Sequence, residues 1–266
     1  GRCEIGTHVH PWCNPPFAEP VNTRNTYLCN LPSDLQQAKI TWLTEAIAMR
    51  FGHRPKSFRA GRYGMGAAAA RTLAEEGYLV DSSVLPFVNY APLGPDYRNA
   101  PYQPYWVSRH DLCLADPSGS LLEIPVSAGF SRPNFAQAQH IKQWAMQPWL
   151  RPLRLAGIAD RLGLARRIKL CPEQADGTRM KKVISAYLRQ GATTLVFMFH
   201  SSSLMAGGSG YIRDEAARED FFQRIEGCYQ YALGDLGLNP KTLTEAAADI
   251  QRHSKSQYGK PAATLT

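Results

Sequence analysis

Short apolar segments of strand character alternate along this chain with longer segments of helical periodicity, and this alternation constrains the fold more than any other feature. Strands and helices in such an order are typical of α/β folds in which neighbouring strands run parallel. The sequence therefore predicts an α/β protein with a parallel sheet. The expected strands lie at 3–9, 56–59, 78–80, 121–126 and 193–199, and the expected helices at 33–51, 65–76, 135–168 (a pair), 176–189 and 214–236.

Two of these helices are marked by residues typical of helix ends. Ser33 and Gln36 have the spacing of a capping box, and Gly52 follows the last periodic residue. Residues 193–199 are almost wholly apolar, which indicates a strand covered on both faces of the sheet. The expected inward faces are Leu35, Trp42, Leu43, Ala46 and Ile47 in helix 33–51, and Met180, Val183, Ile184, Tyr187 and Leu188 in helix 176–189.

We expect one domain over residues 1–250, with insertions at about 86–120 and 135–170, and a C-terminal tail at 251–266. The first insertion is rich in Pro, Tyr and Gly and is too long for an ordinary connection, so we expect it to face a substrate. The N-terminus has neither a Met nor a signal-peptide pattern, and we expect the chain to begin inside a domain.

The composition predicts a cytoplasmic protein. Hydrophobic residues make up 44% and charged residues 20% of the 266 positions, as in soluble globular proteins, and no apolar run approaches the roughly 20 residues that cross a bilayer. Six scattered cysteines without a Cys-x-x-Cys pair fit free thiols in a reducing cytosol better than a disulfide framework or a structural zinc site. The oligomeric state stays open.

The net charge of +8 is partly local in origin. Between residues 140 and 170, seven lysines and arginines face the single acid Asp160. Such an excess indicates either a nucleic-acid interface or a basic surface suited to anionic substrates or membranes. Because no nucleic-acid motif accompanies it, we favour the second interpretation.

Three histidines lie where predicted strands end, and in parallel α/β sheets functional groups gather at strand ends. His8 and His10 alternate on a strand, so their Cβ atoms are ~7 Å apart on one face. Two such imidazoles can close on one zinc ion; the alternative is one hydrogen-bonded and one exposed histidine. His200 follows an apolar strand and is placed either to protonate a leaving group or to cap the loop backbone.

Arg59 and Arg62 flank a tight glycine loop, where an arginine orients a carboxylate, binds an anion bidentately or forms a structural salt bridge. Asp81 is placed to hold such an arginine or to cap the turn at residues 82–83. Glu123 lies on an apolar strand and needs a partner if it is buried, so we interpret it as structural.

In combination, four segments resemble the motifs of the polysaccharide deacetylases, the NodB-homology group of carbohydrate esterase family 4. Glu-Ile-Gly-Thr-His at 4–8 resembles the second motif, and Phe-Arg-Ala-Gly-Arg-Tyr-Gly at 58–64 resembles the third. Residues 77–83 are similar to the segment around the fourth, and Phe-Met-Phe-His at 197–200 to the fifth. Order and spacing match over roughly residues 1–205, and the related deacetylase-like proteins are associated with bacterial surface polysaccharides.

The resemblance implies a distorted (β/α) barrel whose first βα unit is missing at the N-terminus of this chain, together with that unit's aspartate-bearing first motif. It also implies a divalent metal, usually zinc, held by one aspartate and two histidines, and a second aspartate that activates the attacking water. In this chain His8 matches a metal ligand. Trp12 stands at the position of the usual second histidine, and His10 is expected to replace it.

The same resemblance implies roles for the other site residues. His200 would be the general acid, and Arg59 would orient the catalytic aspartate. The substrate-binding residues would be Trp12, Arg62, Tyr63 and Asp81.

Three functions follow as hypotheses. The leading one is a metal-dependent hydrolase that removes N- or O-linked acetyl groups from a saccharide, with no nucleic-acid partner and no membrane span. Under this hypothesis, these 266 residues alone can be inactive. The second is a C–N hydrolase acting on a small amide, because Trp12 is similar to the aromatic residue of the allantoinase-like branch, where the usual metal site is in doubt. The third is a non-catalytic carbohydrate-binding relative.

Overall fold

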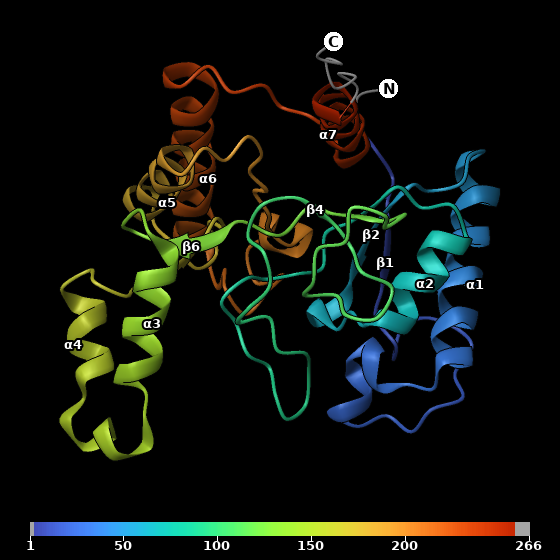
Figure 1. Ribbon diagram of the computed structural model, residues 1–266, viewed down its shortest axis with the longest axis horizontal. Helices are drawn as coiled ribbons and strands as arrows, with labels where there is room; N and C mark the ends of the chain where they lie inside the picture. The colour runs from blue at the N-terminus through green and yellow to red at the C-terminus, as the bar shows by residue number, and fades with distance from the viewer. Residues whose placement is uncertain (1–2, 259–266) are drawn as a thin grey trace, which may run out of the picture.

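The N-terminal half of the molecule is built on a five-stranded sheet (Figure 1). The computed structural model describes residues 3–258. The strand order is β1-β2-β3-β5-β4, and every neighbouring pair is parallel except β4 with β5. The predicted α/β architecture with a parallel sheet is therefore confirmed. The strands are β1 (Thr7–Val9), β2 (Ser57–Ala60), β3 (Val80–Asp81), β4 (Tyr105–Trp106) and β5 (Leu122–Glu123).

The C-terminal half contains a separate two-stranded sheet, in which β6 (Ala128–Phe130) pairs antiparallel with β7 (Arg167–Lys169). Within residues 3–258 neither sheet closes on itself. The distorted barrel that the resemblance implies is therefore not shown.

The register of the first strands brings predicted site residues together. His8 on β1 lies opposite Arg59 on β2, and Phe58 lies opposite Asp81 on β3. Asp81 in turn lies opposite Glu123 on β5. Because side chains on neighbouring strands share a face at matched positions, this register sets Asp81 beside Glu123.

Helix α1 (Ser33–Phe51) occupies the predicted range, and Gly52 ends it with a left-handed φ of 76°. Glycine adopts this conformation at no steric cost. The predicted capping box is wrong. The N-cap is Pro32, and Gln36 donates its side-chain N–H to a loop carbonyl at 2.7 Å instead of to the helix end.

The inward face predicted for α1 is also wrong in part. Trp42 is 47% exposed, whereas Lys39 is fully buried. The Lys39 ammonium donates to three carbonyls of the loop at residues 11–16 and pairs with Glu19 at 2.9 Å. A buried ammonium is stable only when it is paired and hydrogen-bonded, so the helix holds this loop through a polar anchor that periodicity does not reveal. The buried residues of α1 are Gln36, Lys39, Ile40 and Thr44.

The C-terminal half agrees with the sequence in its helices. The predicted helical pair exists, and it forms a hairpin joined by a 3-10 segment at Pro148–Leu153. Asp176 caps α5 by accepting from the backbone N–H of Arg179 at 2.8 Å. The predicted inward face of α5 is confirmed at four of its five positions, while Leu188 is only partly buried. These helices are α3 (Phe135–Ala145), α4 (Leu155–Arg161) and α5 (Gly177–Arg189).

The strand predicted at 193–199 is wrong, because no ladder pairs these residues within the described chain. The segment is nevertheless buried in part. Val196 donates its N–H to the Ser127 hydroxyl at 2.8 Å, and Met198 donates to the Leu170 carbonyl at 3.2 Å. Isolated hydrogen bonds therefore replace a regular strand and still deliver His200 to the end of the segment.

Two long helices close the chain. In α7 (Leu243–Tyr258), Ala247 packs against β3 and β5 in a small core with Val196. Among the described residues no helix is long and apolar enough to cross a membrane, and the six cysteines are free thiols. The remaining helical elements are α2 (Ala67–Glu75), α6 (Glu215–Tyr229), a π-helical continuation at Gln230–Asp235, α7 (Leu243–Tyr258), and 3-10 turns at Arg24–Thr26, Leu28–Asn30, Gly61–Tyr63 and Ser201–Leu204.

Candidate functional site

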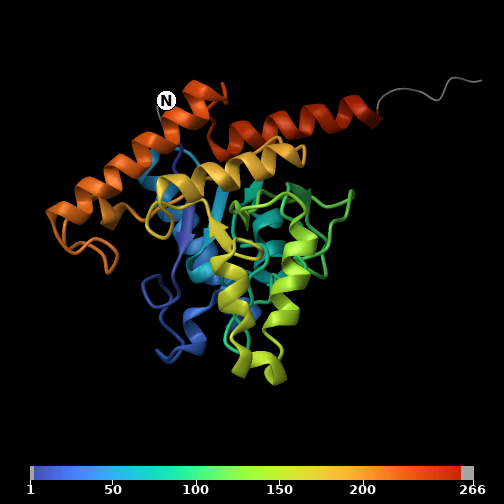
Figure 2. The same ribbon diagram turned by 90° about the vertical axis from the view of Figure 1, so that its left-hand side faces the viewer.

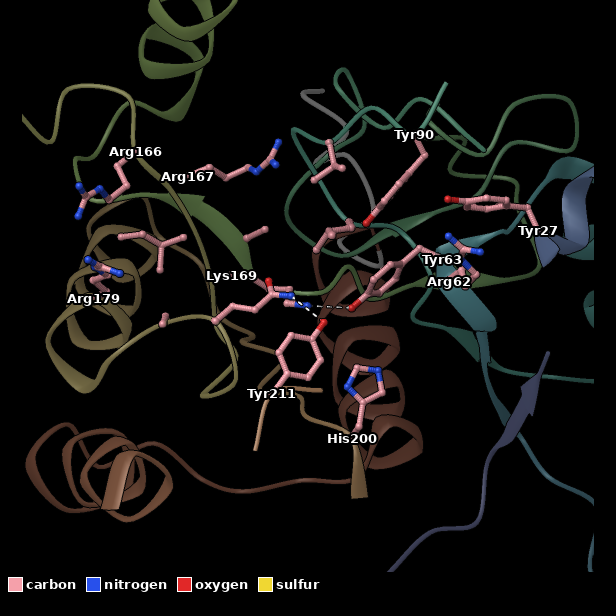
Figure 3. A pocket seen from close by; sticks show the side chains of 16 residues that line it. Tyr27, Arg62, Tyr63, Tyr90, Arg166, Arg167, Lys169, Arg179, His200 and Tyr211 are labelled. Atoms are coloured by element: carbon pink, nitrogen blue, oxygen red, sulfur yellow. Dashed lines mark hydrogen bonds between the residues drawn. The ribbon is translucent and has the colours of Figure 1, made fainter. Parts of the chain in front are cut away.

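A pocket of about 470 Å³ is lined by residues of both halves of the molecule (Figure 3). Its size is within the range of small-ligand sites. No Asp or Glu is among the described residues that line it. Its basic and aromatic lining residues are Tyr27, Arg62, Tyr63, Tyr90, Arg166, Arg167, Lys169, Arg179, His200 and Tyr211.

One wall of the pocket is the 3-10 turn at Gly61–Tyr63. Arg62 and Tyr63 both have positive φ, 54° and 59°, a left-handed backbone conformation that residues other than glycine rarely adopt. Arg62 is fixed there, because its guanidinium donates to the Thr26 hydroxyl at 2.8 Å and lies 4.8 Å above the Tyr27 ring.

The opposite wall is β7. The Lys169 ammonium lies 3.4 Å from the Tyr63 hydroxyl and 5.6 Å from the centre of the Tyr63 ring, so it bridges the two walls. Arg167 donates to the Phe87 carbonyl at 2.7 Å. The pocket therefore depends on the contact of the two halves, which local sequence patterns do not specify.

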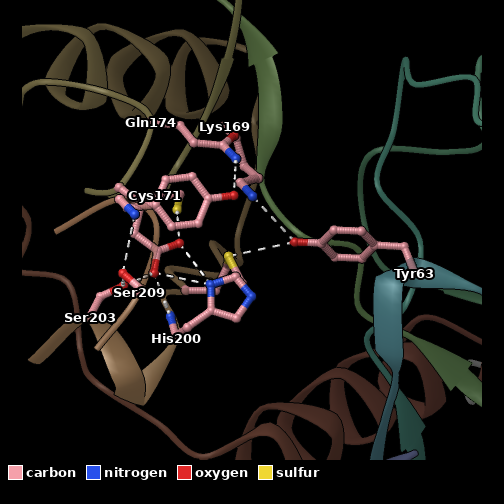
Figure 4. A network of polar contacts seen from close by, with 10 residues as sticks. Tyr63, Lys169, Cys171, Gln174, His200, Ser203 and Ser209 are labelled. Carbon is pink, nitrogen blue, oxygen red and sulfur yellow. Dashed lines mark hydrogen bonds and ion pairs between the residues drawn. The ribbon is translucent and has the colours of Figure 1, made fainter. Parts of the chain in front are cut away.

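His200 lies at the edge of the pocket and is oriented by a carboxylate (Figure 4). Its Nδ1 lies 2.9 Å and 3.0 Å from the two oxygens of Glu173, and its backbone N–H donates to the same side chain at 2.9 Å. Because Nδ1 is engaged by Glu173, Nε2 is left to face the Tyr63 side of the site, as Figure 4 shows. The Tyr211 ring stacks 6.1 Å from the imidazole.

Glu173 is a functional candidate that the sequence did not reveal. Its side chain has no exposed surface, and it accepts a third hydrogen bond from the Ser203 hydroxyl at 2.6 Å. Burial by itself raises the pKa of this carboxyl, but the hydrogen bonds from Ser203 and His200 outweigh it, and the pKa is lower than usual. Glu173 therefore stays ionised. Its acid type just after a β-prone segment was the one available indication, and it is too common to identify a site.

A second histidine cluster lies on β1. His8 and His10 meet edge to face with ring centroids 4.6 Å apart, and Trp12 lies 4.5 Å beyond His10. The close fit requires Gly61, since a Cβ there would lie 2.3 Å from His10 Nδ1. The proximity of His200 contributes to the lowered pKa of both imidazoles, so the three rings share one region.

The two imidazoles have the properties of metal ligands. His8 Nδ1 lies 2.7 Å from the Arg59 carbonyl, which leaves its Nε2 free, and His10 Nδ1 is buried without a hydrogen-bond partner in the described chain. Burial lowers the pKa of His8 and lowers that of His10 to about 4, so both are neutral at pH 7, as metal binding requires.

The two histidines do not make a complete metal site. Residues 3–258 contain no group of three or more His, Cys, Asp and Glu side chains that could hold a metal ion. A catalytic zinc site usually has three protein ligands. His8 and His10 therefore fit two of these places, and the carboxylate that the resemblance implies is not beside them.

Arg59 does not bind a carboxylate directly. Its guanidinium donates to the Ser82 carbonyl and to the Ser82 hydroxyl, each at 2.7 Å. Asp81 and Glu123 are fully buried behind it. Asp81 accepts from the Ser83 hydroxyl at 2.5 Å and also interacts with the Ser82 backbone N–H, and Glu123 accepts from the Val84 N–H at 2.9 Å. The partner that Glu123 was predicted to need is therefore a second carboxyl.

The carboxyl pair holds a proton. Asp81 Oδ2 and Glu123 Oε2 are buried with no donor in the described chain unless one carboxyl donates to the other. Burial raises the pKa of Asp81 to about 6, against the hydrogen bonds from Glu123 and Ser83. Burial and the charge of Asp81 raise the pKa of Glu123 well above its usual value. At neutral pH the pair therefore carries one negative charge and one shared proton.

The structure thus divides the predicted site residues. Arg62, Tyr63 and His200 line one pocket. His8, His10 and Trp12 form a cluster near it but do not line it, and Trp12 is 38% exposed. Asp81 has no exposed surface, and the Arg59 guanidinium is hydrogen-bonded to Ser82. Neither residue lines the pocket.

Comparisons with known proteins assign no family. No family model and no curated protein matches the chain. A crystal structure bearing the name of a polysaccharide deacetylase, from Mycobacterium smegmatis, is 18% identical and has a TM-score of 0.44; the alignment covers 90% of this chain and 62% of that one. The chain thus spans less than two thirds of that structure. A likeness of this extent decides neither fold nor function, which depend on the residues described above.

Proposed function

We propose that this protein is a hydrolase that removes acetyl groups from a saccharide, with His200 as general acid. The observation that carries the proposal is the His200–Glu173 dyad at the edge of a tyrosine-lined pocket. A histidine with one nitrogen held by an ionised carboxylate presents its other nitrogen for proton transfer. Motif resemblance adds the reaction type: the segment ending at His200 is similar to the one that carries the acid in polysaccharide deacetylases.

The dyad is placed to assist breakdown of the tetrahedral adduct that water forms with the acetyl group. Water adds to the acetyl carbonyl carbon, and the bond from that carbon to the sugar nitrogen or oxygen then breaks. The departing atom needs a proton, which His200 Nε2–H supplies, while Glu173 stabilises the imidazolium through Nδ1–H. Acetate and the free amine or alcohol leave, the two protons of the attacking water pass to solvent, and solvent returns one proton to His200.

The pocket suits a sugar ring. Tyr63 and Tyr90 lie nearly parallel, 6.2 Å between ring centroids and 19° between planes, and Tyr211 stacks on His200. Flat aromatic faces with hydroxyl edges offer apolar surface and hydrogen-bonding groups together. Such a lining favours a saccharide over a purely apolar acyl ester.

A divalent metal is part of the proposal, and the family resemblance implies zinc. His8 and His10 would supply two of its ligands, and when bound it would polarise the acetyl carbonyl. Replacing His10 with Ala should lower metal occupancy as measured by elemental analysis of the purified protein. Unchanged occupancy would remove His10 from the ligand set.

Release of acetate from acetylated oligosaccharides tests the proposal directly. We expect acetate from an N-acetylglucosamine oligomer or an acetylated xylan oligomer, and its loss in His200→Ala. His53→Ala is the matched control, because His53 is an exposed histidine at the end of α1 that bonds to the Phe51 carbonyl. Hydrolysis of allantoin without acetate release would favour the C–N hydrolase, and glycan binding without any turnover would favour the carbohydrate-binding relative.

A further inference from the structure

The pocket concentrates positive charge. Five of its lining side chains are cationic: Arg62, Arg166, Arg167, Lys169 and Arg179. Figure 3 shows Arg166, Arg167 and Arg179 on one side and Arg62 on the opposite side, with Lys169 between them. Like charges gathered in a pocket repel one another, so the arrangement is favourable when an anion enters.

These charges are largely uncompensated. Arg179 pairs with Asp176 at 3.2 Å, and the nearby Lys142 pairs with Asp160. Within residues 3–258, the other four lining cations have no carboxylate at ion-pair distance. Lys169 has only the Tyr63 hydroxyl at 3.4 Å, and Arg167 has the Phe87 carbonyl. Both therefore keep donors for a ligand.

We infer that the pocket binds a saccharide that carries a carboxylate or phosphate group, held by Arg166, Arg167 and Lys169 while His200 faces the acetyl-bearing sugar. Guanidinium groups bind both anions bidentately, which makes the two ligands one chemistry at this site. The placement of the acetyl group rests on the proposed function, but the binding of the anion does not.

Calorimetric titration with sugars that lack acetyl groups tests the inference without any turnover. The probes are glucuronate, glucose 6-phosphate and neutral glucose. We expect the anionic sugars to bind at least about tenfold more tightly than glucose, with an affinity that falls as salt rises. The stronger of the two anions identifies the natural group.

The double variant Arg166→Gln, Lys169→Met should lose about tenfold or more in affinity for the anionic sugars. Arg132→Gln, an exposed arginine outside the pocket, should bind as the unaltered protein does. Equal affinities for glucuronate, glucose 6-phosphate and glucose would overturn the inference, as would a double variant that binds normally. Since binding is measured on non-acetylated sugars, either failure leaves acetate release as a separate test of the proposed function.

A second, independent observation concerns the α3–α4 hairpin, which projects from the body of the molecule at the lower left of Figure 1 and faces the viewer in Figure 2. Six large apolar side chains between residues 144 and 162 are between 51% and 70% exposed. They are Trp144, Met146, Trp149, Leu153, Ile158 and Leu162. Single exposed apolar residues are ordinary, but a cluster of this density on one projection marks an interaction surface.

The hairpin is also basic. Arg154 and Arg161 are exposed on it, and the one acid of residues 140–170, Asp160, is already paired with Lys142. Tryptophan and aliphatic side chains beside arginine are the combination that enters the headgroup region of a bilayer. We propose that this hairpin docks on an anionic membrane surface, with Trp149 inserted.

Sedimentation with lipid vesicles tests the docking. We expect binding to phosphatidylcholine vesicles that contain about one third phosphatidylglycerol, and weak binding to phosphatidylcholine alone. The double variant Trp144→Ser, Trp149→Ser should bind about tenfold more weakly. Trp42→Ser on α1, 47% exposed, is the matched control and should not change binding.

Equal sedimentation of the double variant and the unaltered protein would overturn the membrane proposal. A dimer in gel filtration that the double variant abolishes would also overturn it, because the patch would then belong to a second copy of the chain.

Discussion

Two carboxylate sites of this molecule are shielded from solvent, yet their pKa values shift in opposite directions. The side chain of Glu173 has no exposed surface, and its pKa is lowered. Asp81 and Glu123 are buried as whole residues, more deeply than Glu173, and the pKa of both is raised. Burial opposes ionisation at both sites, so the difference comes from the depth of burial together with the donors around each carboxylate.

The donors differ in number and in what they are attached to. Glu173 accepts from the Ser203 hydroxyl and from two N–H groups of His200, whose ring can carry a positive charge. Asp81 and Glu123 face each other. The nearby guanidinium of Arg59 donates to Ser82 and not to either carboxyl. A carboxylate with three donors stays ionised, whereas a pair of carboxyls with few donors retains a proton inside the sheet.

Removal of the imidazole from the His200–Glu173 dyad should have the largest effect on turnover. His200→Ala is expected to lower kcat for acetate release by about 10²- to 10⁴-fold, because the leaving group loses its proton donor. The His53→Ala protein should keep the unaltered kcat. Thermal melting should be nearly unchanged, since His200 is half exposed. A large loss of melting temperature with normal kcat would assign His200 to structure.

Removal of the charge on Glu173 should have the next largest effect. Glu173→Gln is expected to lower kcat by about 10- to 100-fold, the usual cost of losing a group that orients a catalytic residue. The loss should fall on kcat with KM nearly unchanged, because Glu173 orients His200 and does not line the pocket. Glu226→Gln, an exposed change on α6, is the control. An unchanged kcat would show that Glu173 only supports the loop.

Changes at the Asp81–Glu123 pair should alter the stability of the protein rather than its rate of turnover. Asp81 has a folded pKa of about 6, above the value of about 4 in an unfolded chain, so the folded state binds more protons in this window. The free energy of unfolding should therefore fall as pH rises from about 4 to 6. Urea unfolding at a series of pH values measures this slope.

In Glu123→Gln the slope should flatten and the protein should gain about 1–2 kcal/mol at pH 8, because an amide can donate to Asp81 without taking up a proton on folding. Glu75→Gln, an exposed carboxylate on α2, should leave the pH slope as it is. Destabilisation of Glu123→Gln at pH 8 would mean that both carboxyls are ionised and otherwise satisfied.

The smallest effect is expected for one donor of Glu173. Ser203→Ala removes the 2.6 Å hydrogen bond but keeps both bonds from His200. The change should lower kcat by about two- to fivefold, which corresponds to roughly 0.5–1 kcal/mol. Steady-state kinetics against Ser202→Ala, an exposed neighbour, makes the comparison. A loss as large as that of Glu173→Gln would make Ser203 the main support of the carboxylate.

Local patterns predicted the helices better than the strands. The sequence predicted the range of α1 and the inward face of α5, because apolar periodicity and helix-end residues are local signals that extend over one or two helical turns. The sequence did not predict the burial of Lys39, because that burial depends on the loop at residues 11–16, which folds against the helix. Residues 193–199 failed as a strand for a similar reason: apolar content predicts burial, whereas a ladder needs a partner at the right distance.

The candidate site divides in the same way. The sequence by itself identified His8, His10 and His200 as chemical groups at the ends of extended segments, because residue type and local spacing are written in the chain. Only the tertiary structure decided that Glu173 orients His200 and that Asp81 faces Glu123, because those pairs are joined by distances across separate segments. Hydrogen bonds and charge interactions act over a few ångströms, and only folding brings such residues that close.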